Sequence, residues 1–392
     1  MQSVAGDHME GKRLLHSIDI KNLLSFGSDG VSLELEPLNV LIGPNASGKS
    51  NLIEAMSLFA AAPRDIREPV RKGGGVLEWL WKGADQPRAE LYAAIAVGKQ
   101  PLYYYLSFTA QGSSLLLTGE SLARGKDHEK FLFLSEGQGK GKAFMVRDSK
   151  LAHSTFEIEG SLFAQLRDPV HYPELTEVGQ QLGSIRFFRG WGLGRETELR
   201  RPQKVDLPDD FLLEDASNLG LVLNSLKNSP SVKRSLLGKL RLFYDGIEDF
   251  DTRVQGGTIQ VFIHERGDRI IPATRLSDGT LHYLCLLSIL CHPNPPPLIC
   301  IEEPELGLHP DILPTVADLL MEAAQRTQLI VTTHSETLVS KLSEVPETVI
   351  VCERDERGTN LRRLDRPKLE EWLERYTLGE LWRMGEIGGN RW

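Results

Sequence analysis

The chain has 392 residues, of which 41% are apolar and 25% are charged, and its formal net charge is −9. These values are ordinary for a globular protein with room for two or three lobes, each with its own core. The negative charge excludes a globally basic nucleic-acid binder, although it leaves room for a local basic strip.

Neither a membrane span nor a secretion signal is indicated. No apolar run reaches the roughly 18 residues that a membrane helix needs, and residues 1–12 lack the apolar segment of a signal peptide. The four cysteines form no C-x-x-C pair that would indicate a zinc site. We therefore predict a cytoplasmic protein that makes no membrane contact and keeps its cysteines reduced.

The first half of the chain predicts mostly strands. Alternating apolar residues indicate strands, and an apolar period of three to four indicates a helix. In chain order we expect two strands within 14–35, a strand at 38–43, a helix at 49–62 ended by Pro63, a loop-rich stretch at 64–85, several short antiparallel strands within 90–160, and a strand at 184–190.

The second half alternates between helices and strands. The expected elements are helices within 215–244 separated at Pro230, a strand at 258–265, a helix after Ser277, and then a βαβαβ series from 298 to 353. Such a series is typical of a parallel sheet covered by helices. We predict an α/β fold with a mixed sheet, an antiparallel β subdomain and a helical lobe, divided at about 1–190, 191–275 and 276–392.

A glycine-rich loop follows the apolar strand at 38–43 and opens the next helix. It matches G-x-x-x-x-G-K-[ST] with Gly43, Pro44, Asn45, Ala46, Ser47, Gly48, Lys49 and Ser50. In this context the backbone N–H groups of the loop bind phosphate oxygens. The lysine neutralises phosphate charge, and the serine hydroxyl is a ligand for Mg²⁺.

Three further groups follow in the second half. Glu302 and Glu303 end an apolar strand, where two acids are costly to bury unless they meet a cation or water. We interpret Glu302 as the acid on the Mg²⁺ side and Glu303 as the general base. His334 ends the strand after them, and Ser277 with Gly279 begins a helix that a phosphate could approach. Taken alone, a histidine at a strand end, or a serine and a glycine at a helix start, more often has a structural role than a functional one.

The order of GPNASGKSN, RLSDGT, ICIEEPELGLHP and VTTHS resembles the ABC-type ATPase heads of the RecF, SMC and OLD class. It is most similar to the compact bacterial AAA-type members of that class that lack a coiled coil. The resemblance implies ATP and Mg²⁺ as ligands, hydrolysis of ATP to ADP and phosphate, and a P-loop NTPase fold. It further implies homodimers that enclose two ATP molecules.

The resemblance also assigns the site residues. Residues 43–51, including Asn51, look like the Walker A loop, Ser277 and Gly279 like the signature, Glu302 and Glu303 like Walker B, and His334 like the switch histidine. In the implied dimer, Ser277 of one protomer meets the ATP that Lys49 of the other holds, and His334 approaches the γ-phosphate.

The sequence departs from the wider class at several positions. Glu302 stands where an aspartate is usual, and one extra methylene moves a carboxylate by about 1.5 Å, so that contact with Mg²⁺ could run through water. Gln86 is our candidate for the Q-loop glutamine. Only 57 residues follow Ser335, whereas a TOPRIM-type nuclease domain such as OLD-like proteins carry needs roughly 80. We therefore expect that nuclease to be absent from this chain.

The leading hypothesis is an ATPase that switches a separate DNA-associated or anti-phage defence effector, such as a nuclease-like protein, with DNA as a further partner. A RecF-like DNA-repair ATPase is the alternative. The energy subunit of a transporter is disfavoured, because 226 residues separate Ser50 from Ser277. A basic cluster broken by aromatic residues fits either nucleic-acid binding or a solvated strand edge and loop. Its cations are Arg186, Arg189, Arg195, Arg200, Arg201 and Lys204.

Overall fold

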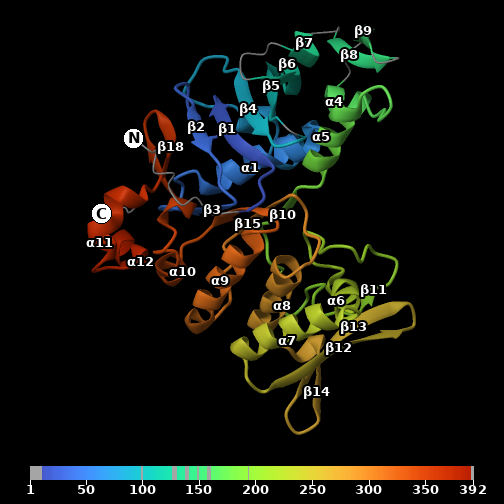
Figure 1. Ribbon diagram of the computed structural model, residues 1–392, viewed down its shortest axis with the longest axis vertical. Coiled ribbons are helices and arrows are strands. Elements are labelled where there is room, and N and C mark those ends of the chain that lie inside the picture. The colour runs from blue at the N-terminus through green and yellow to red at the C-terminus, as the bar shows by residue number, and fades with distance from the viewer. Residues whose placement is uncertain are drawn as a thin grey trace.

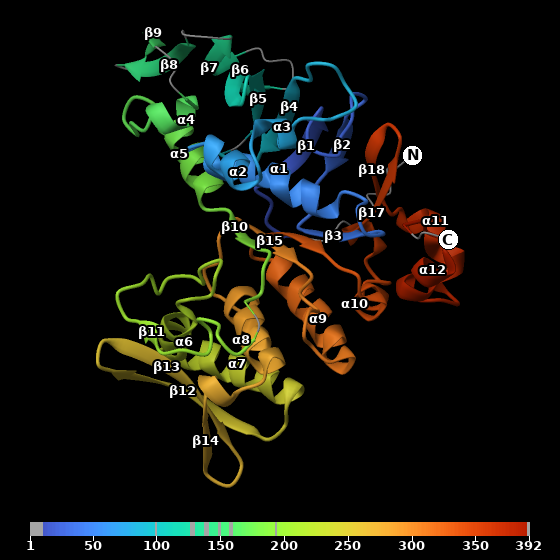
Figure 2. The ribbon, with the colours of Figure 1, turned by 180° about the vertical axis from the view of Figure 1, so that it is seen from behind.

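The computed structural model describes residues 11–98, 100–125, 130–136, 141–147, 150–156, 160–192 and 194–389. Most of the polar stretch at 1–12, and parts of the strand region at 90–160, lie outside this range. A central sheet separates a β-rich lobe, which is at the top of Figure 1, from a helical lobe below it. Figure 2 shows from behind that α1 lies on one side of this sheet and α8 and α9 on the other.

The central sheet has six strands in the order β10-β15-β16-β3-β17-β18. All of its neighbouring pairs are parallel except β17 with β18. The strands are β3 (Leu38–Ile42), β10 (Arg186–Phe188), β15 (Leu298–Glu302), β16 (Gln328–Thr332), β17 (Val349–Asp355) and β18 (Gly358–Arg363). The predicted α/β fold with a parallel sheet is confirmed, and β18 adds an antiparallel edge that the sequence pattern did not indicate.

Helices cover both faces of this sheet because its strands are apolar on both sides. On β15, Leu298 and Cys300 belong to the core under the β-rich lobe, while Ile299 and Ile301 belong to the core of the helical lobe. Parallel strands buried on two faces read as continuous apolar runs rather than as alternating ones. The two cores therefore share one sheet, and a shift of either lobe acts on the ends of the same strands.

The β-rich lobe is built on an eight-stranded sheet in which every pair is antiparallel. Its strands are β1 (Leu15–Lys21), β2 (Val31–Glu34), β4 (Ala89–Ile95), β5 (Leu102–Gln111), β6 (Ser114–Arg124), β7 (Lys130–Glu136), β8 (Gly141–Arg147) and β9 (Lys150–Phe156). The predicted antiparallel subsheet is confirmed. The helices of this lobe are α1 (Lys49–Ala61), α2 (Arg67–Lys72), α3 (Val76–Trp79), α4 (Leu162–Gln165) and α5 (Pro173–Gly183).

The prediction of a loop-rich stretch at 64–85 was wrong for α2 and α3. Both helices are too short to show a clear 3.6-residue period, and Gly73–Gly75 gave a strong turn signal. They form because Val70, Val76 and Trp79 are buried in the core of the β-rich lobe. Tertiary packing of this kind stabilises helices that would not persist alone.

The helical lobe combines four helices with a small sheet. The helices are α6 (Leu219–Lys227), α7 (Pro230–Phe243), α8 (Asp278–Leu290) and α9 (Leu313–Ala324), and the strands are β11 (Gln203–Lys204), β12 (Ile247–Gln255), β13 (Thr258–Glu265) and β14 (Arg269–Pro272). Pro230 is the first residue of α7, as expected of proline at a helix start. Strands β12 and β14 were not predicted; Gly256 and Gly257, both with positive φ, join β12 to β13.

Helix α10 (Glu336–Lys341) connects β16 to β17, and two short helices follow β18: α11 (Arg366–Leu373) and α12 (Leu378–Met384). Helix α12 begins with a capping box between Thr377 and Glu380 and ends at Gly385 in the left-handed conformation. Among the described residues, no helix is long and apolar enough to cross a membrane.

Candidate active site

The predicted site residues gather at one edge of the central sheet. Strands β15, β16 and β3 are parallel neighbours, so their carboxyl ends lie side by side. Glu302 ends β15, His334 follows β16, and the glycine-rich loop follows β3. Ligand sites of open parallel sheets lie at this edge. Three motifs that are far apart in the sequence therefore meet because of strand order alone.

The glycine-rich loop packs against β17 and β18. Gly43, Ala46 and Gly48 all have positive φ, at 149°, 65° and 106°. A Cβ atom on Gly43 would lie 2.3 Å from the carbonyl oxygen of Cys352, and one on Gly48 would lie 2.2 Å from Thr359 Oγ1. Both glycines are thus required by backbone conformation and by close packing together.

A small hydroxyl network fixes the base of this loop. Thr359 Oγ1 donates a hydrogen bond to Ser25 Oγ at 2.7 Å and also approaches the carbonyl oxygen of Ser47 at 2.9 Å. The side-chain amide of Asn51 donates to the same Ser25 Oγ at 2.7 Å. In this structure Asn51 therefore supports the loop from beneath. Neither Ser25 nor Thr359 was singled out from the sequence, because no local motif includes them.

Lys49 lies folded against its own loop. Its ammonium donates to the carbonyl oxygens of Gly43, at 2.8 Å, and Pro44, at 2.9 Å, and only 7% of the residue is exposed. Burial lowers the pKa of Lys49, and the nearby carboxylates of Glu302 and Glu303 are among the groups that oppose this shift. The Ser47 hydroxyl is buried beside it without a hydrogen-bond partner among the described residues. A phosphate in this loop would supply that partner.

The two acids of β15 differ in their surroundings. Burial raises the pKa of Glu302, an effect that Arg189 opposes and that Glu54 and Glu303 increase; a hydrogen bond with Ser50 also opposes it. Glu303 has a φ of 46°, which is uncommon for a residue with a side chain and is typical of functional sites. Its N–H donates to the carbonyl oxygen of Thr332 at 2.9 Å, which fixes this backbone to β16.

His334 faces Glu303 across the strand ends. Its Nε2 lies 3.7 Å from Glu303 Oε1. Burial and the neighbouring Lys49 lower the pKa of His334, with Glu303 opposing them, and this shift favours the neutral ring. Glu305 holds this strand end in place, because its Oε1 accepts hydrogen bonds from Thr333 Oγ1 at 2.8 Å and from the His334 N–H at 2.7 Å. Glu305 thus supports His334 rather than facing solvent.

Ser277 and Gly279 lie in the helical lobe at the start of α8. The Ser277 hydroxyl caps this helix by accepting from the Thr280 N–H at 3.0 Å. Gly279 packs so closely on Gly307 that a Cβ atom would lie 2.8 Å from its carbonyl oxygen. Within the described chain, no hydrogen bond joins Ser277 to the loop at 43–50 of the same protomer. The structure brings the loop, the acids and His334 together, but it leaves Ser277 in the other lobe.

Three of the six cations of the basic cluster form ion pairs within the chain. Arg189 Nη1 lies 2.7 Å from Glu54 Oε1, Arg201 Nη2 lies 2.6 Å from Glu196 Oε2, and Arg200 pairs with Asp278. For these three the arrangement favours the structural interpretation over nucleic-acid binding. Gln86, the Q-loop candidate, is exposed in the loop between α3 and β4.

Sequence reasoning missed Trp191 as part of the site. Its indole N–H donates to the carbonyl oxygen of Glu302 at 2.9 Å. The mixture of aromatic and basic residues around it was visible, but that pattern does not say which distant residue such a ring contacts.

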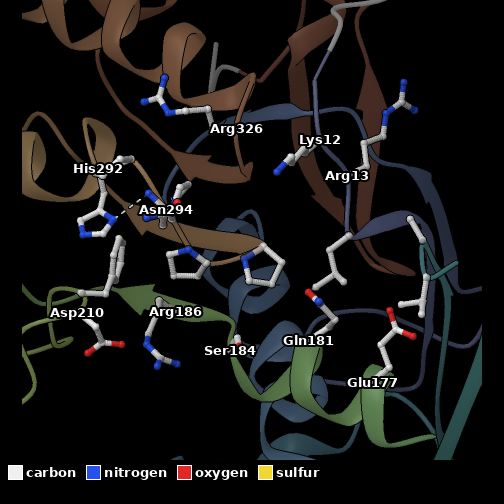
Figure 3. Close-up of a pocket in the computed structure, with 18 of the residues that line it drawn as sticks. Lys12, Arg13, Glu177, Gln181, Ser184, Arg186, Asp210, His292, Asn294 and Arg326 are labelled. Carbon is white, nitrogen blue, oxygen red and sulfur yellow. Dashed lines mark hydrogen bonds between the residues drawn. The ribbon is translucent and has the colours of Figure 1, made fainter. Parts of the chain in front are cut away.

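A cleft of about 920 Å³ opens between the two lobes near the amino-terminal starts of β10 and β15, away from the glycine-rich loop (Figure 3). Lys12, Arg13, Arg186 and Arg326 line it together with the acids Glu177 and Asp210. None of its lining residues belongs to the four motifs. Strand polarity and residue chemistry therefore place the site at the opposite edge, despite the size of this cleft.

The packing of Gly48 can be tested directly. Gly48→Ala should lower nucleotide affinity by about tenfold or more, roughly 1.4 kcal/mol, because the new methyl group must displace Thr359 and Ser25. Gly75→Ala is the matched control, since Gly75 has a similar φ of 96° but nothing within 4 Å of an added Cβ. Titration with a fluorescent nucleotide measures both variants. Equal losses would show that a strained alanine outside the loop lowers affinity as well, and would contradict a specific role for the contact with Thr359.

A family model described as "AAA domain, putative AbiEii toxin, Type IV TA system" matches residues 38–143 and 194–340. Both matched stretches together contain all four motifs. Among curated proteins, the Old nuclease of Escherichia phage P2 is 21% identical over 386 residues. That alignment covers 91% of this chain but 62% of the relative, so the chain spans less than two thirds of that nuclease.

Solved structures of SMC heads share the fold. The head described as SmcHead bound to the C-winged helix domain of ScpA has a TM-score of 0.57 at 13% identity, and covers 91% of this chain and 99% of its own. An Smc head with an extended coiled coil, bound to the C-terminal domain of ScpA derived from Pyrococcus furiosus, has a TM-score of 0.52 at 12% identity, with coverage of 92% and 98%. At this identity the likeness concerns the fold.

Proposed function

The chain belongs to this AAA-domain family and is a P-loop ATPase head of the RecF, SMC and OLD class. On that premise we propose that it hydrolyses ATP to ADP and phosphate in a dimer that encloses two ATP molecules. The observation that carries the proposal is the meeting of the glycine-rich loop, Glu302, Glu303 and His334 at one edge of the sheet. These groups supply phosphate binding, a metal-side acid and a general base within one site.

The loop binds the phosphates of ATP through its backbone N–H groups, as expected of a helix N-terminus. Lys49 leaves the carbonyl oxygens of Gly43 and Pro44 and turns to the β- and γ-phosphates. The Ser47 hydroxyl, which is buried without a partner among the described residues, gains a phosphate acceptor. Nucleotide binding thus replaces contacts that the loop makes with itself.

Mg²⁺ fits beside Ser50, an exposed residue whose side chain forms a hydrogen bond with Glu302. Ser50 and Glu302 would hold the ion, and Mg²⁺ when bound neutralises charge on the β- and γ-phosphate oxygens. No group of three or more His, Cys, Asp or Glu side chains suited to a metal occurs in the described parts of the chain. A site with few protein ligands is usual for Mg²⁺, which keeps several water molecules.

Glu303 acts as the general base that takes a proton from the attacking water. Its backbone is fixed by the Thr332 carbonyl, and its Oε1 lies 3.7 Å from His334 Nε2. In its neutral form His334 can donate one hydrogen bond and accept another. In that state it orients the water or the γ-phosphate beside Glu303.

The signature helix completes the site of a second protomer. Ser277 caps α8 and Gly279 lies in its first turn, and among the described residues neither forms a hydrogen bond with its own glycine-rich loop. A phosphate at the start of α8 would be favoured by the helix N-terminus. We therefore place Ser277 and Gly279 of one protomer on the ATP held by Lys49 of the other, so that each ATP contacts both protomers and stabilises the dimer.

Closure of this dimer is proposed to switch a separate effector in the cytoplasm. The relative from phage P2 is named a nuclease, and that name supports a nuclease-like effector or a DNA-associated role in defence. A RecF-like role in DNA repair is the second candidate, favoured by Lys12 and Arg186, two cations of the cleft between the lobes that form no ion pair among the described residues. A transporter role is disfavoured by the large β-rich lobe between the glycine-rich loop and Ser277.

Light scattering tests the dimer. With a non-hydrolysable ATP analogue and Mg²⁺ we expect the protein to pass from monomer toward dimer as its concentration rises, and ADP should not support this. Lys49→Ala is the control, because it removes the phosphate contact and leaves the helical lobe unchanged. An equal mass with ADP and with the analogue would contradict the proposal. Capture of partners in the two nucleotide states then identifies the effector.

A further inference from the structure

Trp191 forms a hydrogen bond with the peptide group that joins Glu302 to Glu303. Its indole N–H donates to the carbonyl oxygen of Glu302 at 2.9 Å, and the N–H of the same peptide group, on Glu303, donates to Thr332 at 2.9 Å. This peptide is therefore fixed at both of its polar ends. Because Glu303 has a positive φ of 46°, the orientation of its side chain depends on that peptide plane.

The other side of the indole contacts the signature helix. Its ring centroid lies 4.1 Å from that of His282, which is in α8 five residues after Ser277. His282 is fully buried, and its Nδ1–H donates to the carbonyl oxygen of Leu306, just beyond the acids. Phe188 of β10 also stacks on the indole, with ring centroids 6.0 Å apart. Trp191 is thus packed between α8 and the end of β15.

Arg200 attaches the same connecting segment to the start of α8. Its guanidinium donates to the carbonyl oxygen of Leu276, to Asp278 and, at 2.8 Å, to the carbonyl oxygen of Gly194. The N–H of Gly194 also donates to Asp278 at 3.1 Å. These bonds join Arg200 and Gly194 to the residues on either side of Ser277.

We propose that Trp191 is a positioning residue which transmits engagement of Ser277 in one ATP site to Glu303 in the other. This inference rests on the proposed dimer, in which α8 of a protomer serves its partner's ATP while Glu303 serves its own. Arg200 and His282 move with α8, and the indole carries that movement to the Glu302 carbonyl. ATP in one site thereby sets the general base of the second, which makes hydrolysis cooperative.

The test replaces Trp191 by phenylalanine. Trp191→Phe keeps an aromatic ring against His282 and Phe188 but removes the donor to Glu302. We expect kcat to fall about tenfold, with KM for ATP changed less than about twofold, because the bond acts on the base and not on nucleotide binding. The Hill coefficient for ATP should fall from above 1 in the wild-type protein to about 1. Trp372→Phe, on exposed α11, is the matched control and should change neither value.

A second variant tests the same path without altering Trp191, so the inference does not depend on correct folding of Trp191→Phe. Arg200→Lys breaks the multiple bonds to Leu276, Asp278 and Gly194 but leaves Trp191 in place. It should lower kcat and the Hill coefficient in the same direction. Combined with Trp191→Phe it should cost less than the two single effects added, because both act on one path. Additive effects, or a change in KM alone, would overturn the inference.

Amide hydrogen exchange separates this inference from the proposed function. With the ATP analogue, protection should rise together over 277–282 and 302–306 in the wild-type protein, and only over 277–282 in Trp191→Phe. If wild-type protein turns over ATP and exchange over 302–306 is the same in both proteins, the inference fails while the proposed function stands. If the wild-type protein neither dimerises nor turns over ATP, the proposed function is wrong. Equal exchange over 302–306 in the wild-type protein and in Trp191→Phe would then overturn the inference as well.

Discussion

Glu303→Gln should lower ATP turnover by about 10²–10⁴-fold while ATP binding and dimer formation persist. Glutamine has nearly the same shape but cannot accept a proton, so the attacking water loses its base. The contacts that form the dimer, at the glycine-rich loop and Ser277, are unaffected. Phosphate release under single-turnover conditions measures the chemical step, and light scattering measures the dimer that accumulates because ATP is not consumed.

The matched control for this variant is Glu344→Gln, which neutralises an exposed glutamate away from the strand ends. It should leave turnover within about twofold of the wild-type value. Normal turnover in Glu303→Gln would show that another group is the base. Glu305 is a poor candidate for that base, because its Oε1 already accepts hydrogen bonds from Thr333 and His334.

Ser277→Arg should abolish turnover and leave nucleotide binding by the isolated protomer unchanged. A long cation at the start of α8 blocks the approach of the partner's ATP, whereas the loop at 43–50 makes no hydrogen bond to Ser277 in the same described chain. Titration with a fluorescent ATP analogue measures binding, and turnover per protomer is followed over a range of protein concentrations. In the wild-type protein that turnover should rise with concentration, because two protomers form each site.

Ser229→Arg provides the control for this second variant. Ser229 is the residue that precedes α7 in the same lobe, so the substitution places an arginine at another helix start. It should bind and hydrolyse ATP as the wild-type protein does. Turnover that survives in Ser277→Arg, or that is independent of protein concentration, would rule out a site shared between protomers.

The nucleotide motifs were readable from the sequence because each depends on local backbone. The loop at 43–50 needs glycines where φ is positive and a lysine at a helix start, and those requirements are visible in eight consecutive residues. Strand and helix alternation from 298 to 353 likewise predicted the parallel sheet, since βαβ connections leave few arrangements.

Contacts between distant residues were not readable. Trp191 and Glu302 are 111 positions apart, and a tryptophan in a basic, turn-rich stretch has no pattern that names a carbonyl as its partner. The same holds for Thr359, which closes the base of a loop more than 300 residues before it. Short elements such as α2, α3 and β18 were missed or misjudged for a related reason, because packing rather than periodicity stabilises them.

The sequence by itself thus determined the chemistry of this protein: a phosphate loop, two acids, a histidine and a capped helix start in a fixed order. Only the tertiary structure decided how these groups are divided. Strand order places the loop, the acids and His334 at one edge of the central sheet, and the helical lobe holds Ser277 away from them. Backbone geometry is encoded locally, whereas the distance between two lobes depends on the packing of both cores against one shared sheet.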